Sequence, residues 1–227
     1  MPLPWIGHPL RSPRFVLLAF GLAGCAALLV VRGWYAHDLK FRFLAWNLIL
    51  AMVPAIAASA MLRLDRRGAR VLAGACAAVW LLFLPNAPYL ITDLVHLHPR
   101  PPVPYWFDIA LFTTFAGAGL LSAFASFHDV EHVVARRFGR TASWGVLALA
   151  AFAAGFGIYL GRVQRWNSWD LLVQPQDLLA DVTTRLFAPW LHPGAMAVTL
   201  LYGAVLLFGY VAVRVIMRPR PHDQAEA

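Results

Sequence analysis

Charged residues are scarce in this sequence. Asp, Glu, Lys and Arg make up only 13% of its 227 residues, where a soluble domain has about a quarter. Hydrophobic residues make up 60% and occur in runs long enough to cross a bilayer. This composition excludes an ordinary soluble protein, and the length predicts one membrane domain without a separate soluble one.

Cysteine is also rare. Cys25 and Cys76 are the only two, and both lie within apolar runs, so no disulfide is expected. Residues 22–25 resemble a bacterial lipoprotein processing box, but the apolar run continues to Val31, which favours an uncleaved first helix over lipidation of Cys25.

Features typical of several partner classes are missing. The net charge of +8 comes without a basic stretch interleaved with aromatic residues, so no nucleic-acid partner is expected. Membrane lipid is the expected partner, because arginines at helix ends follow from topology and anionic lipid. No phosphate-binding motif surrounds Gly155, Gly157 and Gly161, which we interpret as a helix-packing face. No cofactor is expected, and the oligomeric state is undetermined.

The apolar runs predict an all-α fold, a polytopic bundle of six transmembrane helices. The third helix is expected to be broken, and residues 177–187 are expected to form one interfacial amphipathic helix. The predicted spans are 15–31, 43–62, 71–84 with a half-helix at 87–97, 109–127, 143–160 and 195–213. The corresponding segments are a cytoplasmic N-terminus at 1–14, a transmembrane domain at 15–217 and a cytoplasmic tail at 218–227.

The break in the third span follows from its length. Residues 71–84 give about 21 Å of helix, whereas the hydrocarbon core is about 30 Å thick. Pro85, Asn86 and Pro88 therefore fall inside the bilayer, where irregular backbone needs cover from protein or a wet cavity. Asn86 is a plausible N-cap for the half-helix. Broken helices of this kind present polar groups to ligands in some transporters.

The distribution of basic residues predicts the orientation. Twelve of the 19 Lys and Arg residues lie on the side of the two termini, and seven lie on the other side. The positive-inside rule therefore places both termini in the cytoplasm. The break after Leu84 and the stretch from Arg162 to Asp170 then share the extracytoplasmic side.

Three stretches carry a family resemblance. They are Leu84 to Leu97, Trp106 to Asp108, and Gly157 to Asp170. They resemble the bacterial membrane proteins catalogued as domain of unknown function 1361. The resemblance implies a polytopic protein of the bacterial inner membrane, and it implies no activity.

The outer polar residues form a candidate site for a lipid-linked or anionic small molecule. A helix from residue 87 would place Tyr89, Thr92, Asp93 and His96 on one face. Asp93 and His96 are the candidate catalytic pair, as orienting carboxylate and general base. The candidate ligand-binding residues are Asn86, Tyr89, Asp93, His96, Asp108, Arg162, Arg165, Asn167 and Asp170. The alternative interpretation is that the same groups are helix caps and ion pairs that fix the loops.

Two metal-binding patterns are weak. Asp93, His96 and His98 have loose spacing without a third and fourth ligand. His128 and His132 fit the H-x-x-E-H pattern of inverted zinc peptidases, but no third ligand is identifiable. We therefore predict no metal site.

Three functions remain open. The first is an enzyme or binding protein for a lipid-linked or anionic substrate at the outer leaflet. The second is a small-solute transporter, which the few polar residues within the spans disfavour. The third is a structural or assembly subunit of a membrane complex, which small-residue helix faces would serve.

Overall fold

The computed structural model describes residues 13–216. Most of the predicted cytoplasmic segment at 1–14, and the whole tail at 218–227, therefore lie outside the described residues. The described chain consists of helices and the loops that join them, without a strand. Its elements are α1 Pro13–Ala36, α2 Arg42–Arg66, α3 Arg70–Phe83, α4 Asn86–Thr92, η2 Asp93–His96, α5 Tyr105–Phe138, α6 Arg140–Arg162, α7 Asp170–Val173, α8 Pro175–Phe187, η3 Pro189–Leu191 and α9 Pro193–Ile216.

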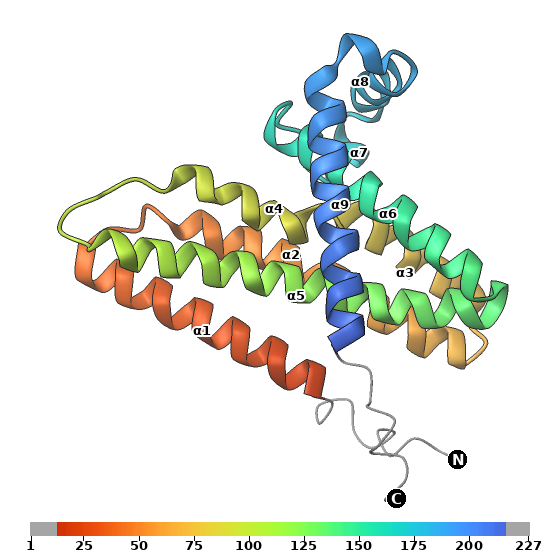
Figure 1. The fold of residues 1–227 in the computed structure, drawn as a ribbon, viewed down its shortest axis with the longest axis horizontal. Coiled ribbons are helices and arrows are strands. Elements are labelled where there is room, and N and C mark those ends of the chain that lie inside the picture. Colours follow the sequence, from red (N-terminus) through yellow and green to blue (C-terminus); the bar gives the residue numbers. More distant parts are fainter. Residues whose placement is uncertain (1–12, 217–227) are drawn as a thin grey trace, which may run out of the picture.

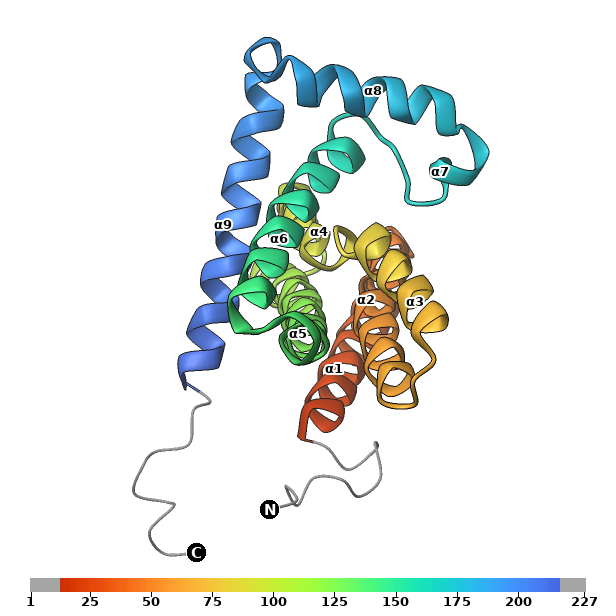
Figure 2. The same ribbon diagram turned by 90° about the vertical axis from the view of Figure 1, so that its right-hand side faces the viewer.

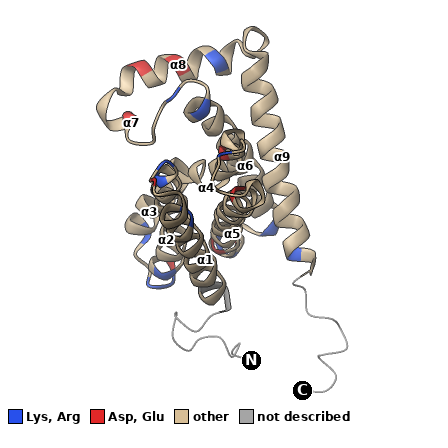
Figure 3. Ribbon diagram, turned by 90° about the vertical axis from the view of Figure 1, so that its left-hand side faces the viewer, with Lys and Arg blue, Asp and Glu red and all other residues tan. Residues whose placement is uncertain are grey.

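Six helical segments in this part of the chain are long and apolar enough to cross a membrane. The third combines α3, α4 and η2, so the predicted six spans with a broken third member are confirmed. Outside α8, the charged residues lie mainly toward the ends of the long helices (Figure 3). The predicted amphipathic helix is confirmed as α8, which begins two residues earlier than expected.

Helix α5 is the centre of the bundle. It packs against α1, α2, α4, α6 and α9, and its buried aromatic residues Phe112, Phe115 and Phe127 form much of the core. Figure 1 shows α1, α2 and α5 side by side, with α9 running across α5 in this view and α7 and α8 beside the upper part of α9. The first turn of α1 and the last turn of α9 lie toward the same end (Figure 2).

The predicted end of the fourth span at residue 127 is wrong. Helix α5 continues to Phe138, through the residues that we expected to form a charged connection. The acidic side chains there are buried against neighbouring helices. Asp129 accepts a hydrogen bond from Ser59 at 2.9 Å, and Glu131 accepts one from Tyr210 at 2.5 Å. A buried carboxylate is tolerated when it is hydrogen-bonded. Because both acidic residues have such partners, the helix can continue through them instead of ending before them.

The broken helix packs closely on its neighbours. A Cβ atom at Gly119 would lie 2.2 Å from the carbonyl oxygen of Ala87, and one at Gly157 would lie 2.4 Å from Cγ of Pro85. Only glycine permits these approaches of α4 to α5 and of the break to α6. The predicted close-packing role of the α6 glycines is thereby confirmed at Gly157.

Candidate functional site

At the break between α3 and α4, side chains donate hydrogen bonds to backbone carbonyls at the end of α3. Pro85 and Pro88 have no backbone N–H, so they cannot continue the helical ladder. The carbonyl of Phe83 instead accepts a hydrogen bond from the Asn86 amide at 3.1 Å, and that of Leu82 accepts one from Ser168 at 3.3 Å. The Asn86 amide also donates to Ser168 at 3.0 Å. The predicted N-cap role of Asn86 is wrong, because Pro85 precedes the helix and Asn86 serves the end of α3.

Arg162, the last residue of α6, clamps the half-helix. Its guanidinium donates to the Tyr89 hydroxyl at 3.2 Å, to Asp93 Oδ1 at 3.3 Å and to the Thr92 carbonyl at 2.5 Å. The other Asp93 oxygen accepts from the Asn47 amide at 2.8 Å. Asp93 is only 1% exposed, so a buried charge is held between a cation and an amide. The structure therefore joins the two sequence stretches that we expected to meet.

A cavity of about 310 Å³ lies next to this clamp, between α2, the broken helix, α6 and the segment from Trp166 to α8. Its wall is largely aromatic and aliphatic and includes Phe156 and three tryptophans. The ring centroids of two of these, Trp46 and Trp169, lie 6.4 Å apart. The polar residues that line it are Asn47, Asn86, Tyr89, Asn167 and Ser168. No charged side chain lines it within residues 13–216. An apolar pocket with a few converging amides and hydroxyls is typical of a ligand site.

Helix α8 covers this cavity as a lid. Leu178 and Val182 of α8 line the cavity, whereas Phe187 is 80% exposed. In Figure 2, α8 reaches from the upper end of α9 across α6 toward the side of α3. The lid thus presents one apolar face to the cavity and leaves further apolar residues exposed, as an interfacial helix does.

Asp181 fastens the lid to the end of α6. Its carboxylate accepts a hydrogen bond from the Trp166 indole at 2.8 Å and pairs with Arg185, one turn along α8. Partial burial opposes ionisation, but the indole N–H and the Arg185 guanidinium outweigh it and hold the pKa of Asp181 below its ordinary value of 3.8. Arg185 also lies over the Tyr159 ring, at 5.8 Å from its centroid.

Besides the clamp residues Asp93 and Arg162, four further predicted site residues lie outside the cavity wall. His96 packs edge-on against Phe43, with ring centroids 5.4 Å apart. Arg165 is exposed and has positive φ, and its side chain has no hydrogen bond or ion pair within the described chain. Asp170 accepts a hydrogen bond from the backbone N–H of Asn167 at 2.6 Å.

The fourth, Asp108, belongs to a separate cluster. It is buried near the start of α5 and accepts from Arg32 Nε at 3.2 Å. Arg32 also pairs with Asp38 and lies 4.2 Å from the Phe41 ring centroid. Partial burial of Asp38 is outweighed by the Lys40 backbone N–H and by Arg32, which lower the pKa of its carboxyl. These contacts tie α1 to α5.

The structure also adds cavity and clamp residues that sequence reasoning missed. Asn47 could have been noticed because it is an amide inside an apolar span. Its hydrogen-bond partner Asp93 could not be predicted, because it lies 46 positions away in the sequence. Trp46 gave no signal, because tryptophan is ordinary at membrane interfaces. Trp166 and Ser168 lie in the stretch from Gly157 to Asp170 that carries the family resemblance, but nothing in the sequence distinguished them from their neighbours there.

No group of three or more His, Cys, Asp or Glu that could hold a metal is found among the described residues. The rings of His128 and His132 lie 4.3 Å apart. Glu131, however, is bound to Tyr210 and Arg214 of α9. Glu131 of the H-x-x-E-H pattern thus ties α5 to α9.

The cavity and the clamp lie within the region that a protein-family model covers. The model described as "Protein of unknown function (DUF1361)" matches residues 46–208. No curated protein and no solved structure matches the chain.

Proposed function

The chain belongs to the DUF1361 family of proteins of unknown function, and we propose that it is an integral membrane protein that binds a lipid-linked molecule beneath α8. The cavity of about 310 Å³ between the broken helix and the lid carries this proposal. It combines an apolar wall for hydrocarbon with amide groups for a polar head group. Small-molecule sites have this mixture of many apolar and few polar groups.

A lipid-linked molecule fits this cavity better than a free anion does. The cavity wall within residues 13–216 carries no charged side chain, and Arg162 donates its hydrogen bonds to protein groups. A free anion would have to leave water without a cation to meet it, which is costly. A lipid-linked molecule can pack its hydrocarbon chain against the tryptophans and leucines, while its polar head group forms hydrogen bonds with the amides.

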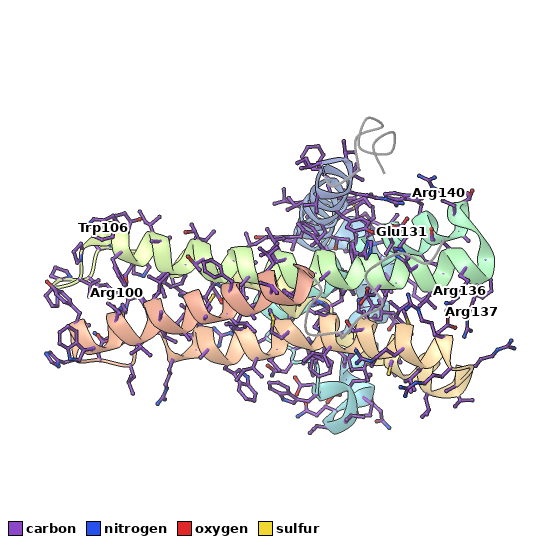
Figure 4. The ribbon with its side chains drawn as sticks, turned by 90° about the horizontal axis from the view of Figure 1, so that it is seen from below. Arg100, Trp106, Glu131, Arg136, Arg137 and Arg140 are labelled. Carbon is purple, nitrogen blue, oxygen red and sulfur yellow. The ribbon has the colours of Figure 1, made fainter. Side chains whose placement is uncertain are left out.

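The orientation follows from the arginines. The turns that join α2 to α3 and α5 to α6 are strongly basic, which favours the cytoplasmic side of a bacterial inner membrane. Both termini are then cytoplasmic, and the cavity faces the outer leaflet. Figure 4 shows Arg100 and Arg137 at opposite ends of the molecule.

Cysteine labelling tests this orientation. In a variant without Cys25 and Cys76, Arg100→Cys is expected to react with a membrane-impermeant maleimide added to intact cells. Arg137→Cys is expected to react only after permeabilisation. Labelling of Arg137→Cys from outside would overturn the orientation and leave the cavity itself unaffected.

Photocrosslinking tests the binding. The probe is a polyprenol with a diazirine beside its hydroxyl group, added to the detergent-solubilised chain. Crosslinks are expected in residues 81–89 and 156–169. Ala153 lines the cavity, so Ala153→Trp is expected to fill it and suppress the crosslinks. Leu149→Trp, on an exposed position of the same helix, is the matched control and is expected to retain them.

Two results would refute the proposal. One is equal crosslinking of the Ala153→Trp and Leu149→Trp variants, and the other is crosslinking spread along the exposed faces of α1 and α9. Competition by inorganic phosphate at equal concentration would instead assign the site to a free anion.

A further inference from the structure

Two tight turns bring four helix ends together at the end of the molecule opposite Arg100. One joins α2 to α3 and the other joins α5 to α6. Gly68 and Gly139 occupy these turns with φ of 77° and 86°, a left-handed conformation that favours glycine. Both connections are therefore short, and each holds the ends of its two helices close together.

Arginine dominates both connections. Four exposed arginines surround the α2–α3 turn, in the turn itself and in the adjoining helix ends, namely Arg63, Arg66, Arg67 and Arg70. Three more lie in the helix ends at the α5–α6 turn, namely Arg136, Arg137 and Arg140. Figure 4 labels these last three at the far end of α5 and the start of α6. We call the seven residues the basic end.

Asp65 joins the two connections. Its carboxylate is buried, with a side chain 3% exposed, and it pairs with both Arg136 and Arg137. The nearby Glu131 is already bound to Tyr210 and Arg214. Within residues 13–216, the other five arginines of the basic end have no ion pair. The arrangement thus fixes a positive surface and leaves most of its charge unneutralised.

Exposed apolar side chains stand beside these arginines. Phe138, between Arg137 and Arg140, is 72% exposed, and Val71, which follows Arg70, is 86% exposed. An occupant that matches this surface offers hydrocarbon as well as negative charge. A phospholipid offers a phosphate to the guanidinium groups and acyl chains to the apolar side chains.

We propose that the basic end binds anionic phospholipids of the adjacent leaflet, with the five unpaired arginines meeting the lipid phosphates. Arginine suits this role because its planar guanidinium forms two parallel hydrogen bonds to a phosphate. A lipid that carries two phosphates on one head group is expected to bind most tightly, since it neutralises arginines from both connections. This surface lies at a different end from the cavity and does not depend on its ligand.

Native mass spectrometry of the full detergent-solubilised chain tests this proposal. The chain is titrated with cardiolipin, and the dissociation constant of the first bound lipid is measured at two salt concentrations. The double variant Arg67→Gln with Arg70→Gln is expected to bind about 25-fold more weakly, at about fivefold for each arginine near an anionic surface. The loss is expected to shrink at high salt, because salt screens exposed charges.

The matched control removes the same charge from the opposite side. Arg42→Gln with Arg165→Gln also neutralises two exposed arginines and is expected to retain cardiolipin binding. An equal loss in both double variants would show that net charge alone attracts the lipid, and no loss in either would also overturn the proposal. So would binding of phosphatidylcholine, or of a short oligonucleotide, as tight as that of cardiolipin.

Discussion

Replacing Gly119 by alanine tests whether the broken helix is held in place by close packing. The added Cβ would lie 2.2 Å from the carbonyl oxygen of Ala87 and 2.9 Å from Cδ1 of Leu90. A backbone carbonyl cannot rotate away as a flexible side chain can, so α4 has to move relative to α5. Overpacking of this kind typically costs about 1–3 kcal/mol of folding free energy.

Gly117 provides the control on the same helix. A Cβ at Gly117 meets nothing within 4 Å. Both substitutions raise helix propensity by about the same amount, up to about 1 kcal/mol. That contribution cancels when the two variants are compared, so the overpacking cost of about 1–3 kcal/mol remains. Gly117→Ala is expected to be at least as stable as the original chain.

Thermal unfolding in detergent measures this difference. Cys25 is fully buried and Cys76 only partly so. In a Cys76→Ala background, a thiol-reactive dye therefore reports exposure of Cys25 on unfolding. The Gly119→Ala variant is expected to melt several degrees below the Gly117→Ala variant. Equal melting temperatures would refute the packing argument.

Two further predictions concern the lid and the clamp. A carboxyl whose pKa is lowered in the folded state stabilises the fold fully when the pH is above the ordinary pKa of the group. This stabilisation is lost as the pH falls through the lowered pKa. Hydrogen exchange at residues 175–187 is therefore expected to accelerate, beyond its intrinsic pH dependence, only below the ordinary value of 3.8. Asp181→Asn should loosen the lid already at neutral pH, and Asp177→Asn should not; equal exchange in both variants would contradict the fastening role. Arg162→Gln is expected to cost up to about 3 kcal/mol, because it leaves buried Asp93 without its cation. Adding Asp93→Asn should recover part of the lost melting temperature, and an unchanged melting temperature for Arg162→Gln alone would sink the clamp.

Local features of the chain were enough to predict the number of spans and the broken third helix. Apolar runs and arginine-rich ends are local, and Pro85 and Pro88 remove backbone donors wherever the fold places them. The amphipathic helix α8 was predictable for the same reason, since its leucines recur at helical spacing. The meeting of the Tyr89–Asp93 segment with Arg162 followed from the expected topology.

Only the tertiary structure decided which polar groups pair. Asp93 and Asp108 looked equivalent as outer carboxylates, yet Asp93 binds Arg162 and Asn47 whereas Asp108 binds Arg32. The choice depends on how far each helix is rotated and on which small residues allow close approach, and neither is a local property. The length of α5 was likewise decided by distant partners, because Tyr210 and Ser59 satisfy its acidic residues. The cavity and its lid exist only once α2, α6 and α8 have been brought around the break.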